Sequence, residues 1–144
     1  MFKKIHENEG VLLLDPRLLI PAQLYTGRPV LIGYSISFMS YIPALGPLME
    51  STLKGVFGVD IFNPSEEAKN VKDIPGDMVK SLWESRTTRE WKEIKEKFGV
   101  VTIFTLSDMK LQLPVLYGPE KKSLSSLTIS KHNKVREFIA YQIL

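Results

Sequence analysis

The sequence predicts an α/β protein: a small three-layer sheet domain with mostly parallel strands and an antiparallel C-terminal strand or hairpin. Two short, continuous apolar runs, "GVLLLDP" (10–16) and "VVTIFTL" (100–106), are typical of strands that are covered on both faces. A capped amphipathic helix directly precedes the second run. The 144 residues, of which 44% are hydrophobic, suit one domain spanning 1–144.

The first unit reads as strand, helix and strand. Pro16 ends the run 10–16, and "RLLIPAQLYTG" (17–27) is a short helix candidate that Gly27 would end. "PVLIGYS" (29–35) is then a second buried strand. This order over about 25 residues favours a right-handed parallel crossover.

The central part predicts helices separated by loops. A loop is expected around residues 36–46, a short helix over 47–56, and an exposed loop or a single helical turn over 65–77. Asp77 is a candidate N-cap for a helix over 78–85. Thr87 and Glu90 have the spacing of a capping box for the next helix, and Gly99 ends that helix.

The C-terminal part predicts two more strands and a helix. "LQLPVLY" (111–117) contains Pro114, which indicates an edge strand or an irregular connection. "SLSSLTIS" (123–130) alternates as a closing antiparallel strand does. The last residues, 132–144, can form an amphipathic helix through Val135, Phe138, Ile139 and Gln142.

Composition excludes several classes of function. The chain has 19 Lys plus Arg against 16 Asp plus Glu, and these charges are interspersed, so no nucleic-acid partner is expected. It has no cysteine, which excludes disulfides, thiolate nucleophiles and Cys-based zinc sites. The N-terminus lacks the apolar core of a signal peptide, and no apolar run reaches the ~20 residues of a membrane span, so the chain as given is expected to be soluble.

The candidate site is the carboxyl edge of the parallel strands, where open α/β sheets bind ligands. This rule nominates side chains that follow the three strands as ligand-binding candidates, together with a loop arginine: Asp15, Arg17, Arg28, Tyr34, Thr105 and Asp108. The alternative for Asp15 is that it caps the next helix or closes an Asp-Pro turn. The alternative for Arg28 is a salt bridge rather than an anion contact.

The same residues indicate no catalytic group, metal site or cofactor. A phosphotransferase would need a second aspartate two residues after Asp15, where Arg17 stands. His6 and His132 lie far apart in the sequence without a ligand spacing that repeats, which is typical of surface histidines.

A resemblance adds to this interpretation. The series "LLLDPRLLIPAQLYTGRPVLIG", "WKEIKEKFGVVTIFT", "LQLPVLY" and "LSSLTIS" resembles the C-terminal soluble domain of multi-pass membrane glycosyltransferases of the GT-C type and related membrane proteins. It covers residues 12–35 and 88–130. The resemblance implies a small α/β module on the extracytoplasmic side of a membrane. The catalytic acids of those enzymes lie in loops of the membrane part, so no catalytic residue is carried over.

Three functions therefore stay open. The first is a non-catalytic accessory or interaction domain with a membrane-embedded or protein partner, on the extracytoplasmic face if the resemblance holds. The second is a stand-alone small-ligand-binding protein or small enzyme with its site at the strand ends, which would be cytoplasmic. The third is a homo-oligomer in which a partner covers the apolar stretch "ISFMSYIPALGPLM" (36–49).

Overall fold

The computed structural model describes residues 10–18, 27–31, 46–60, 63, 76–118, 129–131 and 134–144. Several expectations lie outside these residues: residues 19–26 of the helix over 17–27, the second strand beyond Leu31, most of the loops at 36–46 and 65–77, most of the strand at 123–130, and both histidines.

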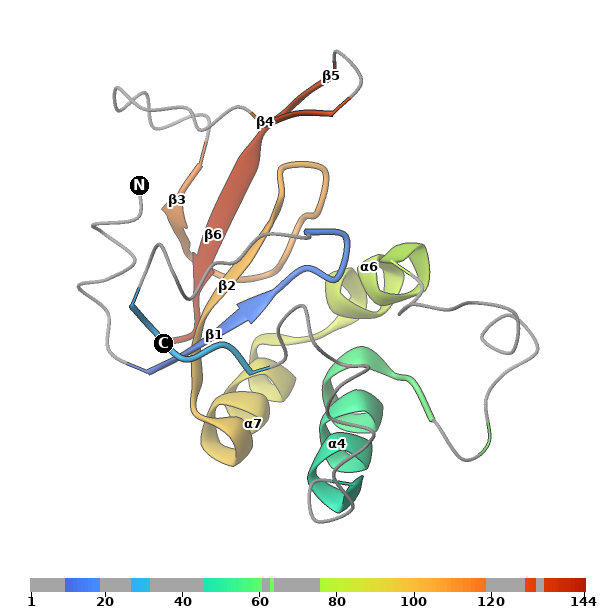
Figure 1. Cartoon of the computed structure of the whole chain (residues 1–144). Helices are drawn as coiled ribbons and strands as arrows, with labels where there is room; N and C mark the ends of the chain where they lie inside the picture. The colour runs from blue at the N-terminus through green and yellow to red at the C-terminus, as the bar shows by residue number, and fades with distance from the viewer. Residues whose placement is uncertain are drawn as a thin grey trace.

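A mixed four-stranded sheet forms the centre of the α/β fold (Figure 1). Its order is β1 (Val11–Leu14), β2 (Val100–Leu106), β6 (Phe138–Gln142) and β3 (Val115–Tyr117). β1 pairs with β2 in parallel, whereas β6 is antiparallel to both β2 and β3. The two predicted buried runs are thus adjacent strands, and 111–117 contributes a three-residue edge strand that begins directly after Pro114.

Residues near Val30 lie beside β1 at its outer edge. The backbone N–H of Leu12 donates to the carbonyl of Pro29 at 2.8 Å, and the N–H of Leu31 donates to the carbonyl of Leu12 at 3.0 Å. This makes a parallel bridge between Leu12 and Val30. The described start of the predicted strand 29–35 therefore has the expected direction relative to β1.

The helices described between residues 46 and 98 agree with the sequence except at one N-terminus. α4 (Gly46–Thr52) continues as a π-helix, η2 (Leu53–Phe57), and together they correspond to the predicted helix 47–56. α7 (Thr88–Phe98) has the predicted capping box, because the Thr87 side chain accepts from the N–H of Glu90 and the Glu90 side chain accepts from the N–H of Thr87. α6 (Gly76–Ser85) already includes Asp77 in its first turn, so the N-cap prediction for Asp77 was wrong.

The predicted C-terminal helix was wrong. Residues 134–136 form β5, which pairs with β4 (Ile129–Lys131) in a separate two-stranded sheet beyond the N-terminal end of β6 (Figure 1). Residues 138–142 form β6 in the main sheet. The spacing of the apolar residues was compatible with a helix, but four consecutive buried residues, Phe138–Tyr141, suit a strand that is covered on both faces. β6 also supplies backbone partners to β2 and β3.

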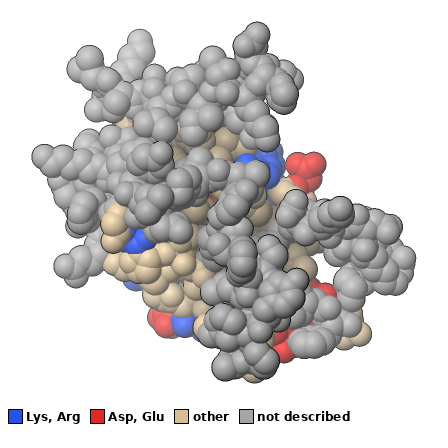
Figure 2. All heavy atoms as spheres, viewed as in Figure 1, with Lys and Arg blue, Asp and Glu red and all other residues tan. Residues whose placement is uncertain are grey.

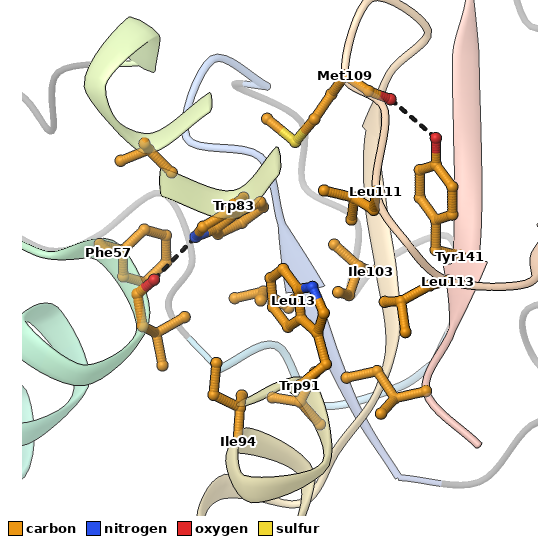
Figure 3. Close-up of a cluster of buried hydrophobic side chains, with 14 of the residues drawn as sticks. Leu13, Phe57, Trp83, Trp91, Ile94, Ile103, Met109, Leu111, Leu113 and Tyr141 are labelled. Carbon is orange, nitrogen blue, oxygen red and sulfur yellow. Dashed lines mark hydrogen bonds between the residues drawn. The ribbon is translucent and has the colours of Figure 1, made fainter. Parts of the chain in front are cut away.

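The described helices pack on one face of this sheet (Figures 1 and 3). Trp83 of α6 lies between Phe57 of η2 and Trp91 of α7, with ring centroids 5.6 Å and 5.7 Å away. Trp83 Nε1 donates to the carbonyl of Val56 at 2.8 Å. The sheet contributes side chains such as Leu13 to the same cluster, and the opposite face carries a second apolar cluster that includes Leu12, Phe104 and Ala140.

The two fully buried tryptophans allow a matched test of this core. Trp83→Phe should destabilise the protein by about 1–2 kcal/mol more than Trp91→Phe, because only Trp83 Nε1 has a hydrogen-bond acceptor in the structure. Both substitutions remove a similar part of an indole ring from the core. Urea unfolding of the two variants measures the difference, and equal losses would contradict the assigned role of the Val56 carbonyl.

Candidate functional site

The carboxyl ends of β1 and β2 meet at one edge of the sheet and bring three predicted site residues together. Asp15 follows β1 directly, and Arg17 stands two residues further on. Asp108 lies in the turn after β2, which is closed by a 3.1 Å hydrogen bond from the N–H of Met109 to the carbonyl of Leu106. Arg17 lies between the two carboxylates and contacts both.

The Asp15 carboxylate is completely buried and its oxygens are engaged within the chain. Oδ1 accepts from the backbone N–H of Arg17 at 2.9 Å and from Arg17 Nε at 3.0 Å. Oδ2 accepts from Arg17 Nη2 at 2.7 Å, with the N–H of Leu106 at 3.5 Å. The side chain thereby closes the Asp-Pro turn, one of the two structural roles considered from the sequence.

Arg17 is held in place by this carboxylate and by close packing. Its stem lies against Gly76 at the start of α6, where an added Cβ would be 2.3 Å from Arg17 Cγ. Its side chain is 18% exposed. The hydrogen bond to Asp15 raises the pKa of the Arg17 guanidinium above its usual value, so this group stays charged.

Asp108 occupies the outer edge of the guanidinium. Arg17 Nη1 donates to Oδ2 at 2.8 Å and Nη2 donates to Oδ1 at 3.0 Å, while the Asp108 side chain is 53% exposed. The hydrogen bond from Arg17 lowers the pKa of the Asp108 carboxyl below its ordinary value. The site therefore has a buried carboxylate on one side of Arg17 and an exposed carboxylate on the other.

Two residues of α6 complete the site and were missed in the sequence. Lys80 Nζ lies 3.9 Å from Asp108 Oδ2 and 3.6 Å from Glu84 Oε1. Glu84 Oε1 also accepts from the backbone N–H of Lys110 at 2.8 Å. The i,i+4 spacing of Lys80 and Glu84 indicates a pair on one helix face, but it carries no information on which strand end that face approaches.

Arg28 and Thr105, two other predicted site residues, do not join this cluster. Arg28 is buried near the start of β1, where Nε donates to the carbonyl of Gly10 at 3.0 Å and Nη1 donates to the Thr102 hydroxyl at 3.2 Å. Thr105 is fully buried, and its hydroxyl donates to the carbonyl of Leu106 at 3.0 Å. Tyr34 lies outside the described residues.

Within the described residues, no group of three or more His, Asp or Glu side chains has the arrangement of a metal site. No helix in that part of the chain is both long and apolar enough to cross a membrane. Described positive and negative side chains are interspersed on the face in Figure 2 rather than gathered by sign. Comparison of the chain with protein families, curated proteins and solved structures finds no match.

The two carboxylates should differ in their importance for stability. Asp15→Asn should lower the free energy of unfolding by about 2–4 kcal/mol, because it leaves Arg17 without its buried counter-charge. Asp108→Asn should cost less than about 1 kcal/mol, since the Asp108 side chain is 53% exposed and Arg17 keeps its pair with Asp15. Chemical denaturation measures both variants, and a larger loss for Asp108→Asn would contradict this ranking.

The Asp108 pair should also stabilise the protein in a pH-dependent way. Because Arg17 lowers the pKa of Asp108 in the folded state, the pair stabilises above the ordinary value of 3.8 and loses its effect as the pH falls through the folded pKa. The difference in unfolding free energy between the wild type and Asp108→Asn should therefore be present at neutral pH and disappear in acid. Unfolding curves for both proteins across this range test the sign, and a difference that grows in acid would refute it.

Proposed function

We propose that this chain is a non-catalytic accessory or interaction domain, the soluble part of a membrane-bound glycosyltransferase-like protein. The proposal that the domain is non-catalytic rests on the burial and the hydrogen bonds of Asp15. This residue has the position in which an α/β enzyme would carry a reactive carboxylate, but its oxygens accept from Arg17 and from backbone N–H groups.

A general acid or base must reach a proton of the substrate. Asp15 is completely buried, and a carboxylate offers about four acceptor positions, which the contacts with Arg17 and Leu106 use. Asp15 therefore works as a structural anchor for Arg17. The exposed part of the cluster, Asp108 with the outer edge of Arg17, suits recognition of another molecule.

The membrane connection rests on the resemblance in residues 12–35 and 88–130. The complete three-layer arrangement with mostly parallel strands is part of the same proposal. Its support is the parallel bridge at Val30 and the second apolar cluster on the sheet face opposite the helices. The partner would be a membrane-embedded segment or another protein, and a second copy of the chain is the remaining candidate.

A stand-alone ligand-binding protein or small enzyme is the second candidate function. The observation that favours it is the meeting of Asp15, Arg17 and Asp108 at the carboxyl edge of β1 and β2. In that case a polar small molecule would contact Arg17 from the side where Asp108 is exposed. Asp15 would position Arg17 and would not react.

Cell fractionation distinguishes the two functions. An antibody against this domain should detect a polypeptide larger than 16.4 kDa in membranes that have been washed with alkaline carbonate. In intact cells, added protease should remove the epitope, because the proposal puts the domain on the extracytoplasmic face. A 16.4 kDa species confined to the soluble fraction would refute the membrane proposal and favour the second candidate.

A further inference from the structure

We infer that the outer edge of Arg17 is a carboxylate-binding site that Asp108 occupies in the free chain, and that an acidic group of another molecule replaces Asp108 on binding. This inference rests on the proposed interaction function and specifies its surface and its ligand chemistry. It is carried by the geometry of Arg17, Asp108 and Lys80.

Contacts other than those with Asp108 also hold the guanidinium in position. Asp15 binds Arg17 Nε and Nη2 from the buried side, and the Arg17 stem packs so closely against Gly76 that an added Cβ would be 2.3 Å from Arg17 Cγ. The outer N–H groups of Nη1 and Nη2 therefore stay directed toward the surface when Asp108 leaves. Such preorganisation lowers the entropic cost of binding.

Asp108 can leave without unfolding its surroundings. It is the third residue of the turn Leu106–Met109, whose backbone hydrogen bond does not involve the Asp108 side chain. The side chain is half exposed, so a rotation about its side-chain bonds moves the carboxylate into water. Because Asp108 is half exposed and Arg17 keeps its pair with Asp15, this rearrangement has a small cost.

The contacts of Asp108 show which chemistry the site accepts. Two parallel N–H···O bonds, at 2.8 Å and 3.0 Å, are the bidentate geometry in which arginine recognises a planar carboxylate. Lys80 provides a second cation 3.9 Å from Oδ2. Asp15 and Glu84 lie beside these cations, which favours a singly charged carboxylate over a phosphate dianion.

Removing the internal carboxylate should open the site to an external one. In Asp108→Ala, sodium acetate should raise the thermal unfolding midpoint by a few degrees over sodium chloride at equal ionic strength once acetate exceeds its Kd tenfold. The wild type should show no acetate-specific rise, because Asp108 fills the site. Asp77→Ala, which removes an exposed aspartate from the same helix as Lys80, is the matched control and should behave like the wild type.

A double variant identifies the binding group. Arg17→Lys in the Asp108→Ala background keeps a positive charge beside Asp15 but removes the planar fork, so the acetate effect should disappear. If Asp108→Ala does not fold, Asp108→Asn is used, and the NMR signal of Arg17 Nε–H reports acetate binding directly. The absence of any acetate-specific change in a folded Asp108 variant would overturn the inference.

The source of the carboxylate is tested with peptides. Hexaglutamate and hexaglutamine are titrated into Asp108→Ala at equal ionic strength. Selective binding of hexaglutamate that depends on Arg17 indicates that the carboxylate belongs to an acidic protein segment. Binding of acetate without binding of hexaglutamate indicates a small carboxylate. Both results support the site. The outcome is independent of cell fractionation: a positive acetate effect in a protein found only in the soluble fraction would retain the site and reject the membrane proposal.

Discussion

Burial of β2 on both edges and both faces is the constraint on which the rest of the structure depends. Its backbone pairs with β1 on one side and with β6 on the other, so its N–H and C=O groups are satisfied without water. Ile103 packs in the cluster under the helices, and Phe104 packs in the cluster on the opposite face. β1 and β6 must therefore lie beside this strand, and the turns after β1 and β2 must meet at one edge.

The buried carboxylate of Asp15 determines how the side chains are arranged at that edge of the sheet. An ionised carboxylate in the protein interior needs both a counter-charge and hydrogen bonds. Arg17 and neighbouring backbone N–H groups provide them for Asp15. The same contacts occupy the Asp15 oxygens and hold Arg17 in contact with Asp108, whose Oδ2 also lies 3.9 Å from Lys80 Nζ. The structural role of one residue thus creates the surface on which the proposed recognition depends.

Hydrogen bonds from side chains to backbone carbonyls connect the helices to one another. The carbonyls of Gly55 and Val56 in the π-helix η2 accept from Arg86 and from Trp83, each at 2.8 Å. The Arg86 guanidinium also lies 5.2 Å from the ring centroid of Trp91, and burial lowers its pKa. A cation near the C-terminal end of a helix interacts favourably with the helix dipole, and Gly55 lies near the C-terminal end of η2. Arg86 therefore connects η2 with α7 while Trp83 connects it with α6.

The sequence by itself determined the elements whose signals are local: the buried strands 11–14 and 100–106, and the capping box of Thr87 and Glu90. It also predicted that Asp15 and Asp108 lie at one sheet edge, because parallel strands end on the same side. Only the tertiary structure decided that Phe138–Gln142 is a strand, since its apolar spacing suits a helix until β2 and β3 supply backbone partners. Tertiary packing likewise placed Arg28 near the start of β1 and Lys80 beside Asp108. The physical reason is that the spacing of residues along the chain shows which side chains lie on the same face of a helix or strand. The charge partner of a side chain depends instead on which distant element packs against that face.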